Sequence, residues 1–209
     1  MDKLTQQLDA DLAANVEKAR RSLVEIHNGH GGASAGIVVR ADGLVITNAH
    51  VIGRRVKIRL PDGETLAARL IAYDREHDLA ALSVTAPGLP VIEFGDSKHL
   101  RPGQWVMAIG HPWGVAGAAT AGIVIGNGAE FPEFKTGGRE YIVVSLQMRP
   151  GNSGGPLVDD RGRLVGISTM INGPDVGVAV PAHLVEMFLR EIGIVTPARQ
   201  PHSAESMFV

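Results

Sequence analysis

The stretch Arg149-Pro150-Gly151-Asn152-Ser153-Gly154-Gly155-Pro156-Leu157-Val158 is the most informative part of the chain. Its three glycines surround one serine, and glycine lets the backbone bring N–H groups close to whatever the serine touches. A hydrophobic segment, Tyr141–Leu146, precedes this turn. The pattern favours a turn that presents a nucleophilic hydroxyl. The alternative is a glycine-rich hairpin whose serine faces solvent.

Composition places the 209 residues among ordinary globular proteins. Hydrophobic residues make up 44% and charged residues 20%, and the formal net charge is −2 with no dense Lys/Arg block. We therefore expect no binding to nucleic acid or to an anionic membrane surface. Every apolar run is far shorter than a membrane span. The sequence has no cysteine, which excludes disulfides, zinc–thiolate sites and a cysteine nucleophile.

The two ends of the chain have helical patterns. Residues 1–21 contain no Gly or Pro, and apolar residues recur at every fourth position: Leu4, Leu8, Leu12 and Val16. This spacing predicts an amphipathic helix that packs on the domain surface, with a coiled-coil contact to another subunit as the alternative. An apolar face over residues 182–193 predicts a second helix that stops at Gly193. Residues 194–209 are expected to form a flexible tail.

Between these helices the sequence is typical of a β protein. Short Val/Ile-rich runs alternate with turn signals such as Ala41-Asp42-Gly43, at the spacing of antiparallel barrels or sandwiches. The runs are Leu23–Ile26, Gly36–Val39, Leu44–Thr47, Val56–Leu60, Thr65–Ala72, Leu79–Val84, Trp105–Ile109, Thr120–Ile125, Tyr141–Leu146, Leu157–Val158, Leu164–Thr169 and Gly177–Val180. We expect an all-β fold of two antiparallel six-stranded β-barrels, over residues 22–97 and 98–181.

Two further residues have the chemistry to act with Ser153. His50 ends the run Ile46-Thr47-Asn48-Ala49-His50, and Asp78 begins the apolar run Asp78-Leu79-Ala80-Ala81-Leu82. Each pattern alone is more often structural. Together they follow the order His50, Asp78, Ser153, which is one of the orders found in catalytic triads. A serine hydroxyl needs an adjacent base, and a carboxylate orients an imidazole, so the three residues predict nucleophilic catalysis.

These motifs resemble those of trypsin-like serine peptidases of the HtrA/Deg group. The resemblance rests on Thr47-Asn48-Ala49-His50-Val51, Asp78-Leu79-Ala80, Gly151-Asn152-Ser153-Gly154-Gly155 and Gly110-His111-Pro112-Trp113-Gly114, and it covers residues 22–192. It implies two chymotrypsin-like barrels and a serine endopeptidase that hydrolyses extended or unfolded polypeptides. It also implies a triad of His50, Asp78 and Ser153, and an oxyanion hole formed by the N–H groups of Gly151 and Ser153.

The resemblance further implies a substrate-binding region. Its expected residues are Met148, Arg149, Ser168, Thr169, Met170, Ile171 and Val178. Gln147 stands where trypsin has a cation-binding aspartate, so a preference for Lys or Arg is not expected. The apolar side chains among these residues favour small or medium aliphatic residues instead. Arg149 at the mouth is expected to favour acidic residues near the scissile bond. The alternative function is a catalytically idle polypeptide-binding or chaperone module on the same fold. A serine esterase of another fold is disfavoured by the all-β texture and by the lack of a strand–helix Gly-x-Ser-x-Gly elbow.

Regulation and assembly are expected to differ from those of full HtrA proteins. Sixteen residues follow Gly193, so we expect no PDZ domain. The resemblance implies a trimer, but the family's N-terminal aromatic contacts have no counterpart before Tyr73. Neutral Asn152 replaces the aspartate with which digestive relatives bind a new N-terminus, so activation by cleavage is not expected. We expect no cofactor, no metal and no signal peptide, and the location is either cytosolic or a compartment reached with a leader since removed.

Overall fold

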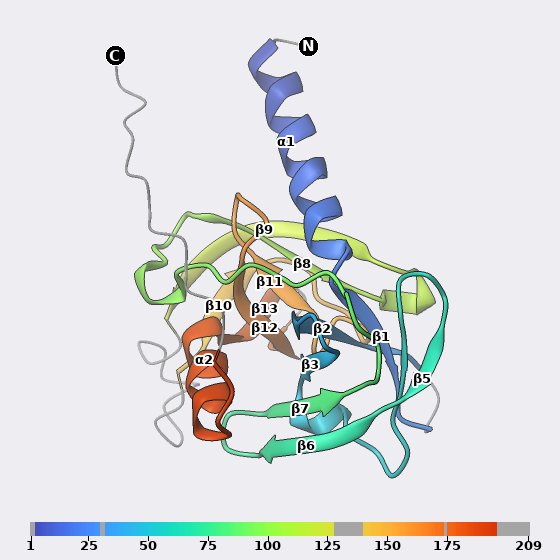
Figure 1. The fold of residues 1–209 in the computed structure, drawn as a ribbon. Helices are drawn as coiled ribbons and strands as arrows, with labels where there is room; N and C mark the ends of the chain where they lie inside the picture. Colours follow the sequence, from blue (N-terminus) through green and yellow to red (C-terminus); the bar gives the residue numbers. More distant parts are fainter. Residues whose placement is uncertain (1–2, 30–31, 128–139, 174, 196–209) are drawn as a thin grey trace.

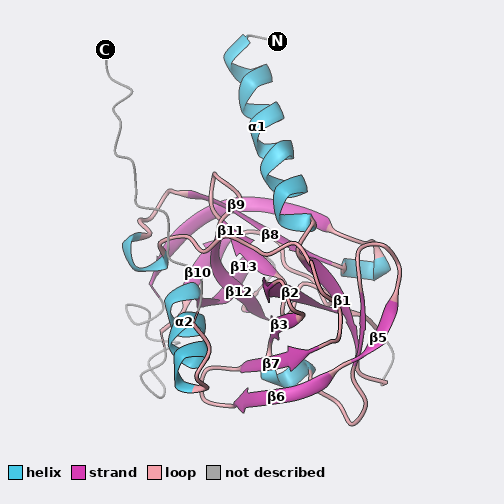
Figure 2. Cartoon of the chain, in the orientation of Figure 1, coloured by secondary structure: helices cyan, strands magenta, loops and turns pink. Residues whose placement is uncertain are grey.

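The computed structural model describes residues 3–29, 32–127, 140–173 and 175–195. Strands make up most of the body, and the two α-helices are α1 (Lys3–Arg20) and α2 (Ala182–Glu191) (Figures 1 and 2). All twelve runs expected to be strands coincide with observed strands, and the all-β fold class is confirmed. Of the expected tail 194–209, residues 196–209 lie outside the described part of the chain.

The first half of the chain folds into a curled antiparallel sheet with the order β5-β4-β1-β2-β3-β7-β6. Its strands are β1 (Leu23–His27), β2 (Ser34–Arg40), β3 (Leu44–Thr47), β4 (Lys57–Arg59), β5 (Thr65–Ala67), β6 (Arg69–Asp74) and β7 (Leu79–Ser83). β5 and β6 lie at opposite edges of the sheet, yet only Ala68 separates them. The sheet therefore has to curl until its edges meet. The expected six strands become seven because one sequence run is divided at Ala68, whose N–H donates to the Val56 carbonyl.

The second half of the chain closes into a six-stranded barrel with the order β10-β13-β12-β11-β8-β9. Its strands are β8 (Trp105–Gly110), β9 (Ala118–Asn127), β10 (Ile142–Ser145), β11 (Pro156–Val158), β12 (Leu164–Ile171) and β13 (Val176–Pro181). Gly122 permits the tight contact between β9 and β10, because a Cβ there would lie 1.8 Å from the Ser145 carbonyl oxygen. This close approach explains why glycine interrupts an otherwise apolar strand.

The two halves share one hydrophobic core. A single cluster of buried side chains contains Ile37 and Ile46 from the first sheet together with Ile109 and Ile167 from the second barrel. The connecting segment also pairs with β12, since the N–H of Leu164 donates to the Glu93 carbonyl at 2.8 Å. Because both halves bury apolar side chains against each other, the residues at their junction are held in fixed relative positions.

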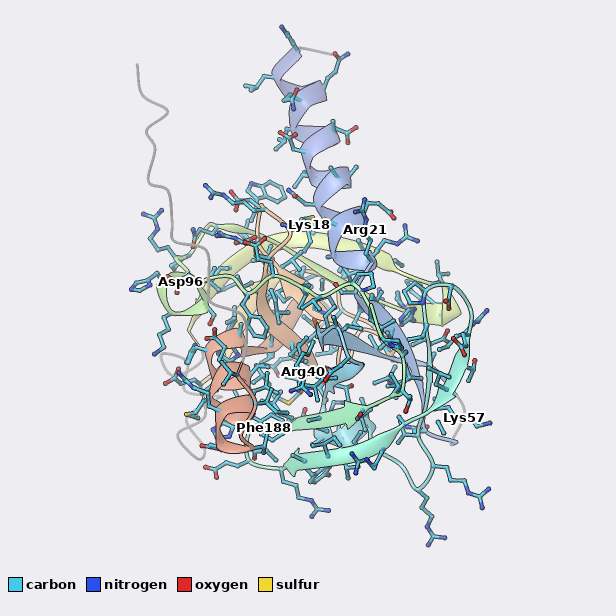
Figure 3. All side chains as sticks on the ribbon, viewed as in Figure 1. Lys18, Arg21, Arg40, Lys57, Asp96 and Phe188 are labelled. Carbon is cyan, nitrogen blue, oxygen red and sulfur yellow. The ribbon has the colours of Figure 1, made fainter. Side chains whose placement is uncertain are left out.

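The helix α1 packs on the body only through its C-terminal end (Figure 1). Leu4 and Leu8 are 75% and 51% exposed, whereas Ala19 is 1% exposed. Lys18, near the base of the helix (Figure 3), forms an ion pair with Glu93 at 3.0 Å. The expectation that the helix packs along the domain surface therefore holds for its last turns alone. The reason is that its apolar stripe continues beyond the edge of the barrel surface.

The helix α2 packs through the apolar face that its sequence predicts. Val185, Phe188 and Leu189 are buried, and Phe188 points toward the barrels (Figure 3). The helix ends as expected: Gly193 has φ +76°, and the N–H of Ile194 donates to the Leu189 carbonyl at 2.8 Å. This arrangement is a glycine-dependent helix C-cap. None of the described helices is both long enough and apolar enough to span a bilayer.

Candidate active site

The pairing of β3 with β7 brings His50 and Asp78 together. Thr47, at the end of β3, is opposite Ala80 near the start of β7. His50 follows β3 in a 3₁₀ turn, Ala49–Val51, and Asp78 comes directly before β7. The imidazole Nδ1 of His50 lies 2.9 Å from Oδ2 of Asp78, and the backbone N–H of His50 donates to Oδ1 at 3.0 Å. Strand register thus fixes this pair.

The carboxylate of Asp78 is held by donors from both halves of the protein. Besides His50, the Thr169 hydroxyl donates to Oδ2 of Asp78. Burial raises the pKa of the Asp78 carboxyl, but the hydrogen bonds from His50 and Thr169 outweigh it and hold the pKa below its ordinary value. Asp78 is therefore ionised at neutral pH. Its backbone adopts a φ of 55°, which aspartate tolerates better than most residues.

Thr169 connects Asp78 with Ser153. The Thr169 carbonyl accepts a long hydrogen bond of 3.5 Å from the Ser153 hydroxyl. Thr169 is the extra residue of a β-bulge, because Ser168 and Met170 pair with the consecutive residues Ala179 and Val178. A bulge re-aims a side chain relative to the regular strand. Sequence reasoning assigned Thr169 to substrate binding and missed its contact with Asp78, which no spacing in the sequence signals.

The first sheet also fixes the backbone around Ser153. The N–H of Ala35 donates to the Ser153 carbonyl at 2.9 Å, and the N–H of Gly154 donates to the Ser168 carbonyl at 2.9 Å. The three candidate side chains thus meet in one region between the two halves. Over the described parts of the chain, however, no hydrogen bond joins the imidazole of His50 to the Ser153 hydroxyl. The hydroxyl faces Thr169 instead.

The segment before Ser153 forms a type II turn. The N–H of Asn152 donates to the Arg149 carbonyl at 2.9 Å, and Gly151 has φ +105°. Pro150 at the second position and glycine at the third are the residues that a type II turn requires. Relative to a type I turn, the peptide between residues 150 and 151 is flipped. No described group accepts a hydrogen bond from the N–H of Gly151 or of Ser153, so both are available to an incoming oxygen.

Two buried residues, Asn152 and His111, hold this turn in place. The Asn152 side-chain oxygen accepts from the N–H of Arg149 at 2.9 Å, and the N–H of His111 donates to the Gly151 carbonyl at 2.9 Å. The His111 imidazole lies 3.1 Å from the Val24 carbonyl, and its Nδ1 faces the N–H of Gly117 at 3.4 Å. Burial lowers the pKa of His111, so this histidine is neutral and structural at pH 7.

The expected substrate-binding residues divide into exposed and buried groups. Met170 and Ile171 are 41% and 49% exposed, and Arg149 is exposed as well. Ser168, Thr169, Met148 and Val178 are all buried. Met148 and Val178, expected to line one pocket, belong to two different clusters of buried side chains. Neither presents much surface to a substrate in this structure. Among the residues that the structure describes, no three His, Asp or Glu side chains are grouped so that they could hold a metal ion.

Two packed β-barrels, with a His–Asp pair from the first beside a serine from the second, define the chymotrypsin-like class of proteins. The trypsin-like peptidase domain family matches residues 34–167, and the chain belongs to this family. It is 36% identical to the putative serine protease HhoB of Synechocystis over 156 residues, which are 72% of this chain and 38% of that protein. It is 41% identical to a probable periplasmic serine endoprotease, DegP-like, of Marinomonas, over 66% of this chain and 29% of that protein.

Solved structures agree with this assignment. The HtrA-type protease AlgW with a tripeptide has a TM-score of 0.79 at 30% identity, over 87% of this chain and 63% of that one. The serine endoprotease from Yersinia pestis has a TM-score of 0.77 at 26% identity, over 87% of this chain and 66% of that one. The chain spans well under half the length of the curated relatives named above.

Proposed function

We propose that the protein is a serine endopeptidase with Ser153 as nucleophile, His50 as general base and Asp78 as the residue that orients the imidazole. The observation that carries this proposal is the continuous set of contacts from His50 through Asp78 and Thr169 to Ser153, beside the unengaged N–H groups of Gly151 and Ser153. The family assignment and the serine proteases among its relatives support the same activity.

The geometry supports a stepwise mechanism. Because Asp78 accepts the Nδ1–H of His50, Nε2 keeps its lone pair and can take a proton. The Ser153 hydroxyl turns from the Thr169 carbonyl toward this nitrogen and attacks the scissile carbonyl carbon. The N–H groups of Gly151 and Ser153 stabilise the oxyanion, an effect worth about 2.7–4 kcal/mol per donor in another protease. His50 then protonates the leaving amine, and water hydrolyses the acyl-enzyme.

The proposed substrate is an extended polypeptide. Past Ile167, the side of β12 that faces away from β13 has no strand paired with it in the described chain, so residues 169–171 offer a free sheet edge. A peptide added to this edge would bind through backbone hydrogen bonds, which tolerate many sequences. One similar structure contains an HtrA-type protease with a decapeptide. We propose a small or medium aliphatic residue on the acyl side of the bond.

Labelling with a fluorophosphonate probe, followed by digestion of β-casein, tests the proposal. The expected results are covalent modification at Ser153 and cleavage of β-casein, both lost in Ser153→Ala. The matched control is Ser145→Ala, which removes an exposed hydroxyl from β10 of the same barrel. A protein that binds unfolded casein without labelling or cleavage would be the idle polypeptide-binding module, and the endopeptidase proposal would be wrong.

A further inference from the structure

We propose that Trp113 and Arg149 form a specificity subsite that binds an acidic side chain on the leaving-group side of the scissile bond. This inference rests on the proposed endopeptidase function and goes beyond it, since it assigns a substrate feature to two residues. Both residues line a cavity of about 220 Å³, and Thr120 and Gln147 add polar groups to its wall.

The strand order of the second barrel places this cavity relative to the substrate. β11 lies between β12 and β8, and Ser153 lies three residues before the start of β11. The free edge at residues 169–171 of β12 serves the acyl side. The cavity is lined by the turn after β8, by the start of β9, by the Arg149–Asn152 turn and by Gln147. Apart from Gln147 and the turn, its lining belongs to the side of β8 and β9. It therefore lies on the opposite side of Ser153, where the leaving group departs.

Trp113 is held at the mouth of this cavity in an unusual conformation. Its φ is 55°, which is rare for a bulky residue, and its side chain is 79% exposed. The N–H of Val115 donates to the Pro112 carbonyl at 2.9 Å, and the neighbouring N–H of His111 bonds to Gly151. These bonds couple the position of Trp113 to the oxyanion turn. Residues with strained backbone conformations cluster at active sites and ligand-binding positions.

Arg149 supplies a cation that no described acid neutralises. Its guanidinium carbon lies 5.8 Å from the centre of the Trp113 ring, and no ion pair involves it among the described residues. The acid in the same region, Asp175, accepts a hydrogen bond from Gln147 at 3.0 Å. A guanidinium binds a carboxylate through two parallel hydrogen bonds, and the methylene groups of Asp or Glu would pack on the indole. The subsite thus suits an acidic residue.

Matched quenched peptides test this subsite. Each peptide carries one β-casein cleavage sequence with Glu, Gln or Lys at the first, second or third position after the bond. For the wild type we expect kcat/KM at one of these positions to be about three- to tenfold higher for Glu than for Gln, as a charged hydrogen bond at a partly exposed site allows. The ratio should fall to about one in Arg149→Gln and favour Lys in Arg149→Glu. The wild-type preference for Glu over Gln should remain in the control Arg190→Gln, which removes an exposed charge from α2.

The possible outcomes distinguish a failure of the subsite proposal from a failure of the endopeptidase proposal. Hydrolysis with equal rates for Glu and Gln at all three positions, or a ratio that Arg149→Gln leaves unchanged, would overturn the subsite and leave the endopeptidase intact. Absence of both hydrolysis and fluorophosphonate labelling would overturn the endopeptidase proposal and the subsite with it. Because Arg149 is exposed, its variants should melt near the wild-type temperature. Arg149→Lys keeps the charge without the planar fork and should give an intermediate ratio.

Discussion

Replacing Gly151 by alanine should inactivate the enzyme while leaving the barrel folded. An added Cβ would lie 2.4 Å from the His111 carbonyl oxygen and 2.9 Å from Cα of Pro112, both backbone atoms that cannot yield easily. The φ of +105° adds a strain of about 1–3 kcal/mol for any residue other than glycine. A change to a type I turn would relieve both the steric contacts of the Cβ and the backbone strain, but it would flip the peptide between residues 150 and 151. The Gly151 N–H would then point away from the oxyanion.

The size of the effect follows from the lost donor. One oxyanion donor is worth about 2.7–4 kcal/mol, so kcat should fall by about 10²–10³. Because the change acts on the transition state, KM should change much less than kcat. The assay is hydrolysis of a quenched casein peptide, with the rate of fluorophosphonate labelling as a second measure and thermal melting as a test of folding.

The chain contains a matched control for this prediction. Arg101-Pro102-Gly103-Gln104 repeats the pattern of the Arg149–Asn152 turn: the N–H of Gln104 donates to the Arg101 carbonyl at 3.1 Å, and Gly103 has φ +88°. A Cβ on Gly103 would meet nothing within 4 Å. Gly103→Ala should therefore cost about 1–2 kcal/mol of stability without loss of kcat. A Gly151→Ala variant whose kcat stays within threefold of the wild type would refute the reasoning.

Substitutions at three further residues test the contacts around the candidate active site. Thr169→Val removes the hydroxyl that donates to Asp78 and should lower kcat about tenfold, with recovery in Thr169→Ser; an unchanged kcat would remove Thr169 from the site. Asp78→Asn should lower kcat by about 10⁴. Its stability deficit relative to wild type should also shrink as pH falls through the lowered pKa of Asp78, below about 4. The pKa of buried His111 is lowered, so protonation favours the unfolded state, and wild-type stability should fall as pH drops below about 6.5. Urea unfolding at several pH values should show that the stability of His111→Gln falls less with decreasing pH than that of the wild type. An equal pH dependence of stability in the two proteins would contradict the assignment of His111 as a buried, neutral histidine.

The strands and the His50–Asp78 pair were predictable from the sequence because both follow from local patterns. Apolar runs between glycine and aspartate turns fix where each strand begins and ends. His50 and Asp78 lie at the ends of two such runs, and antiparallel pairing of β3 with β7 places those ends side by side. The division of one run at Ala68 was not predictable, because it depends on how far the whole sheet curls.

The burial of individual side chains was harder to predict, because distant packing sets it. Periodicity identifies the apolar stripe of α1, but only the barrel surface determines that Ala19 is buried while Leu8 is exposed. Met148 and Val178, which the resemblance places in a pocket wall, are buried in two different clusters, and their contact with substrate stays a prediction. The direction of an apolar side chain at a strand end depends on which neighbours leave room for it, and one sequence does not contain that information.

The contact between the two halves explains why the candidate site needs so many small residues. The Thr47 hydroxyl donates to the Ala35 carbonyl at 2.8 Å. A Cβ on Gly154 would lie 2.1 Å from both of those oxygens. The backbone beside Ser153 therefore packs directly against the backbone of Ala35 and the side-chain hydroxyl of Thr47, the last residue of β3. The position of the proposed nucleophile relative to its proposed base is thus a property of the packed junction, and we expect a larger residue at position 154 to separate the two halves of the site before it alters either half.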